Sequence, residues 1–278
     1  MTTAICLAGA ASFIVSLILT RCVMAVAPRF GFVDKPGHRK IHANPKPLGG
    51  GIAITLSLLG VLAVGVAIGL STSTDSGELA LQQGLRQQMP LAIGFAAAML
   101  AMHVMGLIDD RRALGAYVKL IVQLLVVGSF VIGMEFFAQE TPSLRLRALT
   151  YLDQFGAGPW PSIAVTVLWI VAITNAFNFL DNMDGLSAGV AAVCTAAFLA
   201  TALTIEQWFV AALLATLLGS LLGFLVWNFP PARLFMGDSG SLVIGFVLGV
   251  MTVRTTYLAP GNALQASWYA TLVPVVVL

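Results

Sequence analysis

The chain has 278 residues, of which 59% are hydrophobic and 9% are charged, and its formal net charge is +2. Charged residues make up roughly a quarter of an average soluble domain, so this composition excludes a soluble globular protein. The small net charge gives no reason to expect a nucleic-acid partner. The apolar runs are continuous rather than alternating, which excludes an outer-membrane barrel and predicts an all-α, polytopic transmembrane helical bundle.

Nine apolar segments have about the length that a membrane helix needs. They lie at about 3–27, 47–70, 89–108, 116–137, 162–179, 186–204, 208–228, 240–258 and 266–278. Together they predict a single integral-membrane domain over residues 1–278. The last segment reaches Leu278 without a polar flank, so we expect a chain truncated at its C-terminus, with about ten or eleven helices in the full-length protein. The first segment lacks a basic flank and a cleavage site, and is expected to be a helix rather than a signal peptide.

The distribution of Lys and Arg predicts the orientation of the helices. The segment 28–46 is the most basic loop of the chain, and the positive-inside rule therefore places it in the cytoplasm, with the amino terminus outside. Alternation of the loops then gathers most of the aspartates near helix ends on the cytoplasmic side. These are Asp34, Asp109, Asp110, Asp181, Asp184 and Asp238.

The basic loop also contains candidate substrate-binding residues. Lys40 and His42 belong to a Lys/Arg/His cluster that can attract a phosphorylated substrate or an anionic headgroup. The plain alternative is that the positive charge only fixes the topology. Topology does not explain Gly49 and Gly50, which stand in a run of three glycines where the next helix is expected to begin.

Asp109 and Asp110 are adjacent carboxylates at a predicted helix end. They repel each other and are poorly solvated there, so a divalent metal or a base with a raised pKa would account for the pair. The alternative is a solvated pair neutralised by Arg111 and Arg112. His103, inside the same apolar helix, is interpreted as a buried structural histidine.

A second acidic pair follows the run that ends near residue 180. Asp181 and Asp184 are three residues apart and would share one helical face if the segment is helical. Asn175 and Asn178 extend that face with amide groups. Such oxygen ligands suit Mg²⁺, or Mn²⁺, rather than zinc, and the alternative is a polar turn between two helices.

Asp238 lies between two glycines and next to Ser239, at a predicted helix start. Backbone N–H groups at a helix start favour an anion, and Asp238 could hold the metal that a phosphate binds. The alternative is an ordinary cap of the following helix. Carboxylates, amides and basic side chains at one membrane surface, without a Ser-His-Asp set, a zinc motif or a P-loop, predict metal-assisted transfer involving phosphates.

Four of these segments, in this order, resemble the polyprenyl-phosphate N-acetylhexosamine-1-phosphate transferases, glycosyltransferase family 4. The resemblance runs from Asp34 to about Phe246. It covers the Lys/Arg/His loop with Gly-Gly, the Asp-Asp pair followed by Leu114, Lys119 and Gln123, the segment Asn-Ala-x-Asn-x-x-Asp-x-x-Asp-Gly, and Phe-Met-Gly-Asp-x-Gly-Ser.

The resemblance implies roles for the matching positions. Asp109 and Asp110 would lie at the lipid-phosphate and metal site, with Asp109 a candidate base. Asp238 would be a direct Mg²⁺ ligand, and Lys119 would neutralise phosphate. Residues of the third segment would bind the nucleotide sugar or shape the metal site, namely Asn175, Asn178, Asp181 and Asp184. The first loop resembles the branch that uses UDP-N-acetylglucosamine more than the branch of the peptidoglycan enzyme MraY.

Two features of the chain depart from the family pattern. Asn182 stands where relatives often have glycine. The histidine-containing cytoplasmic motif that the family carries near its last helices is absent from these 278 residues. The loss of that motif would bear directly on activity.

The activity implied is transfer of a sugar-1-phosphate from a UDP-N-acetylhexosamine to undecaprenyl phosphate, with release of UMP. It would take place on the cytoplasmic face of a bacterial inner membrane, as the first membrane step of cell-wall or lipopolysaccharide biosynthesis, and a homodimer is left open. Direct attack by the lipid phosphate and a covalent aspartyl-phosphate route both remain open. Two other classes are a Mg²⁺-dependent intramembrane prenyltransferase and a membrane transporter.

Overall fold

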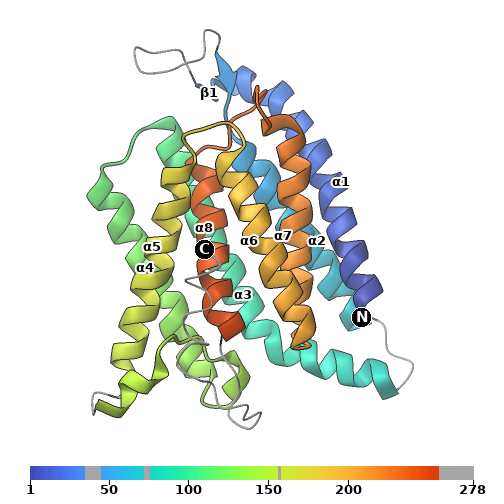
Figure 1. Cartoon of the computed structure of the whole chain (residues 1–278), viewed down its shortest axis with the longest axis vertical. Coiled ribbons are helices and arrows are strands. Elements are labelled where there is room, and N and C mark those ends of the chain that lie inside the picture. The colour runs from blue at the N-terminus through green and yellow to red at the C-terminus, as the bar shows by residue number, and fades with distance from the viewer. Residues whose placement is uncertain (35–44, 72–75, 156–157, 257–278) are drawn as a thin grey trace.

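The computed structural model describes residues 1–34, 45–71, 76–155 and 158–256. These residues form eight α-helices, a result that confirms the predicted all-α fold (Figure 1). The helices are α1 (Thr2–Val26), α2 (Gly50–Ser71), α3 (Ser76–Arg111), α4 (Ala116–Phe137), α5 (Trp160–Leu180), α6 (Leu186–Thr204), α7 (Trp208–Asn228) and α8 (Asp238–Thr256). Of these, α1 to α7 are long and apolar enough to cross a membrane. The ninth predicted helix, 266–278, lies outside the described residues.

Helix α3 is longer than the sequence predicted, because it begins at Ser76 rather than near residue 89. The prediction followed hydropathy, and the first turns of α3 are polar. Those turns are nevertheless rich in Glu, Gln, Leu and Ala, which are good helix formers. Figure 1 shows this part crossing the lower end of the bundle before the helix rises, and Pro90 inside α3 supplies a cause for the bend.

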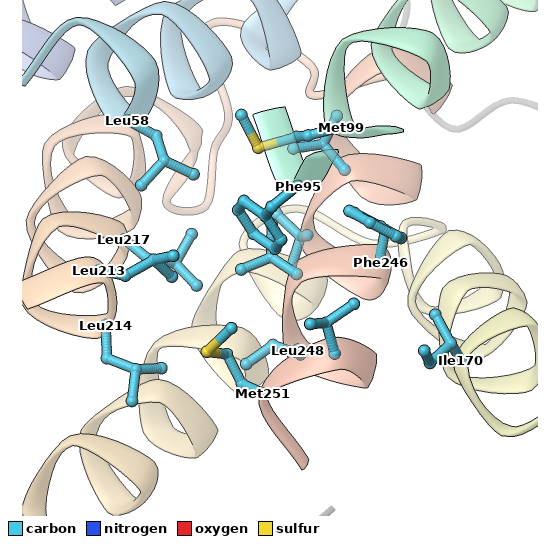
Figure 2. Packing of buried hydrophobic residues seen from close by; sticks show 14 of the residues in the cluster. Leu58, Phe95, Met99, Ile170, Leu213, Leu214, Leu217, Phe246, Leu248 and Met251 are labelled. Atoms are coloured by element: carbon cyan, nitrogen blue, oxygen red, sulfur yellow. The ribbon is translucent and has the colours of Figure 1, made fainter. Parts of the chain in front are cut away.

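Helix α8 is the centre of the bundle. It packs against α2, α3, α5 and α6, and every residue from Ser239 to Val253 is buried. A helix that is apolar on all sides belongs in a core. Phe246 of α8 stacks on Phe95 of α3, with ring centroids 5.5 Å apart, and Figure 2 shows this pair between Leu213 of α7 and Ile170 of α5.

The chain order of the helices determines which loops share an end of the bundle. The C-terminal ends of α1, α3, α5 and α7 meet the starts of α2, α4, α6 and α8 at the upper end in Figure 1. A short antiparallel ribbon, β1 (Val33–Asp34) with β2 (Lys46–Pro47), lies at the same end. The five aspartates near helix ends, from Asp109 to Asp238, are therefore gathered at one end, as the alternation of loops predicted.

At the opposite end, an ion-pair network holds the segment between α4 and α5. Arg147 is only 8% exposed. Its Nε lies 2.9 Å from Glu135 of α4, and its Nη1 pairs with Asp153 and donates to the Ser162 hydroxyl of α5 at 3.1 Å. One buried guanidinium thus joins α4, α5 and the segment that connects them.

Arg147→Met is expected to lower the free energy of unfolding by about 3 kcal/mol, because it leaves two partly buried carboxylates without the buried cation that they share. Thermal unfolding in detergent would measure the loss. Arg145→Met is the matched control, because Arg145 lies 3.7 Å from the same Glu135 and its side chain is 31% exposed, so its pair should contribute little. Equal losses in the two variants would contradict a central role for Arg147.

Candidate active site

The start of α8 is held by backbone contacts with the start of α2. The N–H groups of Gly50 and Gly51 donate to the carbonyl oxygens of Phe235 and Met236, each at 3.0 Å. A Cβ on Gly51 would lie 2.2 Å from the backbone nitrogen of Gly240, so the two helices touch through their main chains. Close packing of the two helices therefore explains the second and third glycines of the run, Gly50 and Gly51.

Each of the two glycines that the sequence predicted to bind substrate has a structural reason to be glycine. Gly49 has a φ of +110°, which an L-residue rarely adopts. A Cβ on Gly50 would lie 2.2 Å from the ring of Phe224. A substrate-binding role for Gly49 and Gly50 stays a prediction, as does the role of Lys40 and His42, which lie outside the described residues.

Asp110 fastens the end of α3 to the start of α8. Its Oδ1 accepts the backbone N–H of Asp238 at 2.7 Å, and its Oδ2 accepts that of Ser239 at 3.2 Å. These are N–H groups that a helix start leaves unsatisfied. Gly106, one turn earlier in α3, permits the approach, because a Cβ there would lie 2.4 Å from the Cα of Ser239. Asp110 therefore acts as a cap supplied from another helix.

Asp110→Asn is expected to lower the free energy of unfolding by about 2 kcal/mol, because the amide replaces a charged acceptor that binds two N–H groups. The melting temperature in detergent would report the change. Asp109→Asn is the control, since its amide oxygen can still accept the N–H of Leu114, and a loss below about 1 kcal/mol is expected. If both variants melt at the same temperature, Asp110 is not the cap inferred from its contacts.

Asp109, Lys119 and Asp238 form the accessible centre of the site. The Nζ of Lys119, in the first turn of α4, lies 3.0 Å from Asp109 Oδ2 and 2.8 Å from Asp238 Oδ2. The three side chains are 12–25% exposed, so they are partly desolvated yet within reach of a ligand. One ammonium thus balances two carboxylates drawn from the ends of α3 and α8.

Asp181 adds a further carboxyl group next to these three side chains. Burial, together with the nearby carboxylates of Asp238 and Asp110, raises the pKa of Asp181 well above its usual value. Four carboxyl groups therefore interact around one lysine, and a cation would relieve their repulsion. This electrostatic excess favours binding of a metal ion at this end of the bundle.

The two asparagines of α5 join the helices around the site. The Asn178 amide donates to the Ser241 hydroxyl of α8 at 2.9 Å. The side-chain amides of Asn175 and Gln123 of α4 donate hydrogen bonds to each other, and Gln123 is fully buried. Gln123 was part of the family resemblance, but its pairing with Asn175 could not be read from the sequence.

The segment from Asp181 to Asp184 is a turn between two helices, which was the stated alternative, so the two residues do not share a helical face. Helix α5 ends at Leu180, and Gly185, with a φ of +72°, precedes the first residue of α6. Asp184 Oδ2 instead accepts the backbone N–H of Ala232 at 2.8 Å. Asp184 therefore fixes the segment 229–237 that leads into Asp238.

Asn228 and Lys46 also hold this segment, and the sequence reasoning missed their role there. The side chain of Asn228 accepts the N–H of Gly185 at 3.0 Å and donates to the Leu234 carbonyl at 2.9 Å. Lys46 Nζ donates to the Ala232 carbonyl. The signal for Asn228 was available, because it is a lone amide at the end of an apolar run.

His103 is 7% exposed, in agreement with the interpretation as a buried structural histidine. Its Nδ1 lies 2.9 Å from the Ser239 carbonyl oxygen and 3.2 Å from the Thr55 hydroxyl. Because the carbonyl can only accept, Nδ1 carries the proton. His103 thus links α3 to the start of α8 through Ser239, and it also lies next to Thr55 of α2.

The donor set around Lys119 fits an open magnesium site rather than a closed cage. Among the described residues, no group of three or more His, Cys, Asp or Glu side chains is placed to hold a metal ion. Mg²⁺ usually takes only one or two carboxylates and fills its other positions with water and substrate phosphates. Asp109 and Asp238, which share one ammonium, offer oxygens of that kind.

Comparison with known proteins gives one family and several relatives. The sequence model described as glycosyl transferase family 4 matches residues 92–256. The chain is 33% identical, over 96% of its length, to the probable undecaprenyl-phosphate N-acetylglucosaminyl 1-phosphate transferase of Bacillus subtilis, and covers 67% of that protein. It is 30% identical over 94% of its length to the decaprenyl-phosphate N-acetylglucosaminephosphotransferase of Mycolicibacterium smegmatis, covering 62%.

A third relative belongs to the peptidoglycan branch. The chain is 30% identical, over 89% of its length, to the phospho-N-acetylmuramoyl-pentapeptide-transferase of Desulforudis audaxviator, and covers 75% of it. The chain thus spans between about three fifths and three quarters of these relatives.

Proposed function

The chain belongs to glycosyl transferase family 4, and on that premise we propose that it transfers N-acetylglucosamine-1-phosphate from UDP-N-acetylglucosamine to undecaprenyl phosphate, releasing UMP. The names of the relatives from Bacillus and Mycolicibacterium support the sugar and a polyprenyl phosphate acceptor. The reaction would be the first membrane step of cell-envelope polysaccharide synthesis.

The observation that carries the proposal is the position of Lys119 between Asp109 and Asp238. In the reaction, an oxygen of the lipid phosphate attacks the β-phosphorus of the UDP-sugar. The bond from that phosphorus to the bridging oxygen breaks, and UMP leaves with the electron pair. The Lys119 ammonium can replace one of its carboxylate partners with a phosphate oxygen. It would then neutralise the negative charge that develops on the phosphate in the transition state.

Asp109 and Asp238 would hold Mg²⁺, or Mn²⁺, which when bound neutralises and orients the diphosphate. Asp109 is also the candidate base for a proton on the lipid phosphate. That phosphate is largely ionised near pH 7, so charge neutralisation contributes more than proton removal. Asp110, which is engaged with the start of α8, would act by positioning Asp238.

The proposed location is the cytoplasmic face of a bacterial inner membrane. The described parts of the basic loop, 28–34 and 45–46, lie at the same end of the bundle as the carboxylate cluster. The positive-inside rule assigns the end that carries this loop to the cytoplasm. The carboxylate cluster lies at an end of the bundle rather than midway along the helices, and this position favours an enzyme over a transporter.

The test is an assay of membranes containing the protein with undecaprenyl phosphate, Mg²⁺ and a panel of UDP-sugars, reading UMP. UMP is expected with UDP-N-acetylglucosamine only when the acceptor is present, and EDTA should abolish it until Mg²⁺ or Mn²⁺ is restored. No UMP from any UDP-sugar would overturn the proposal. A prenyltransferase would release diphosphate instead, and phosphate trapped on Asp109 by rapid quench would replace direct attack with the covalent route.

A further inference from the structure

A groove of about 780 Å³ opens between α1, α2 and α3 at the same end of the bundle as the candidate active site. Its walls are mostly apolar and include Val26 of α1, Phe30 and Phe32 beyond it, and Ile52 of α2. Arg111 and Arg112, at the C-terminal end of α3, also line it. The groove is therefore apolar along its length and strongly basic where α3 ends.

Helix α3 separates this groove from the carboxylate cluster. Val104, Leu107, Ile108 and Arg111 line the groove, and their spacing of i, i+3, i+4 and i+7 places them on one helical face. The neighbouring Asp109 instead bonds to Lys119 of α4, and Asp110 bonds to α8. A molecule in the groove would thus contact the opposite side of α3 from the candidate active site.

Among the described residues, no carboxylate neutralises the positive charge of the two arginines. Within 1–34, 45–71, 76–155 and 158–256, no carboxylate forms an ion pair with either guanidinium. Arg111 lies over the ring of Phe32, with its Cζ 4.7 Å from the ring centroid. The residues 35–44 of the adjoining loop contain no Asp or Glu. An exposed guanidinium that stacks on an aromatic ring and has no carboxylate partner among the described residues is suited to a phosphate.

We propose that this groove binds an anionic membrane phospholipid, whose acyl chain lies along the apolar walls and whose phosphate meets Arg111 and Arg112. Basic pockets between transmembrane helices on the cytoplasmic side hold anionic headgroups in this way. A zwitterionic lipid carries an ammonium that the two arginines repel. The polyprenyl phosphate acceptor is not the occupant, because its phosphate must reach Lys119, which lies across α3. The inference does not depend on the transferase activity.

The test is native mass spectrometry of the purified protein in neutral detergent, titrated with phosphatidylglycerol or phosphatidylcholine. One tightly bound phosphatidylglycerol is expected, with at least tenfold preference over phosphatidylcholine. Arg111→Gln/Arg112→Gln should weaken phosphatidylglycerol binding about 25-fold, since each arginine near the surface is worth about a factor of five. Binding of phosphatidylcholine should not change.

Arg233→Gln is the matched control, because Arg233 is also exposed at this end and lies over an aromatic ring, 5.8 Å from the Trp227 centroid. Its phosphatidylglycerol affinity should stay within about twofold of the parent. Val104→Trp, which fills the groove and keeps both arginines, should also lose the lipid, with an unchanged melting temperature showing that it folds.

Three results would overturn the proposal. One is an unchanged affinity in Arg111→Gln/Arg112→Gln, and another is an equal loss in Arg233→Gln, which would indicate diffuse attraction to the whole surface. The third is displacement of phosphatidylglycerol by an equimolar amount of undecaprenyl phosphate, which would assign the groove to the acceptor lipid.

Discussion

Asp238→Asn is expected to lower the rate of UMP formation by about a thousandfold while leaving the fold intact. Its carboxylate is one of two that share the Lys119 ammonium, at 2.8 Å, and one of two that would hold the metal. The substitution keeps the size of the side chain and keeps the backbone N–H that donates to Asp110. It therefore removes charge from the site without removing the cap of α8.

The measurement is UMP release against UDP-N-acetylglucosamine concentration, giving kcat and KM, with the melting temperature as a check on folding. Asp184→Asn is the comparison, because its amide oxygen can still accept the Ala232 N–H, and a loss below about tenfold is expected. If Asp238→Asn retained the parent rate, Asp238 would not be part of the catalytic centre. A loss of activity above about tenfold in Asp184→Asn would indicate that Asp184 also belongs to the catalytic centre.

Gly51→Ala is expected to lower the free energy of unfolding by about 3 kcal/mol, the cost of overpacking a close contact. The added Cβ would lie 2.2 Å from the Gly240 nitrogen and 2.4 Å from the Ser239 carbonyl carbon. Both are main-chain atoms at the start of α8, so no side chain can rotate away. Because the start of α8 carries Asp238, the transferase activity should fall together with the stability.

Gly60→Ala in the same helix is the matched control for this prediction. A Cβ at Gly60 meets no atom within 4 Å, and alanine is the better helix former by up to about 1 kcal/mol. A melting temperature equal to or above that of the parent is therefore expected for Gly60→Ala, against a marked fall for Gly51→Ala. Similar melting temperatures in the two variants would contradict main-chain contact between α2 and α8.

The helices of the bundle were largely predictable because their hydropathy changes sharply at the ends. Helices α4, α6 and α7 begin and end at the predicted residues. The position of the aspartates at one end of the bundle was predicted from the fact that successive loops alternate between the two ends. The exception is the start of α3, where a polar helix carries no hydropathy signal and only the residues' helix propensity could have indicated it.

The partners of the site residues were not predictable, because sequence spacing says nothing about the register between distant helices. Asp110 was predicted beside Asp109 as a metal ligand, but it bonds to backbone groups 128 and 129 residues away. Asp181 and Asp184 would have shared a face only in a helix, and α5 already ends at Leu180, so the two aspartates lie in a turn. Lys119 was expected to meet a phosphate, and its two carboxylate partners come from the ends of two other helices.

The central position of α8 has a consequence for the biosynthesis of the protein. Chains fold from the N-terminus as they are made, and α8 is the last helix of the described part. The helices that surround α8 are therefore synthesised before α8 itself. Lys119 can pair with Asp238 only after α8 has been inserted between those helices. We expect nascent chains released before α8 to accumulate without activity, and the catalytic centre to be assembled in one late step of insertion.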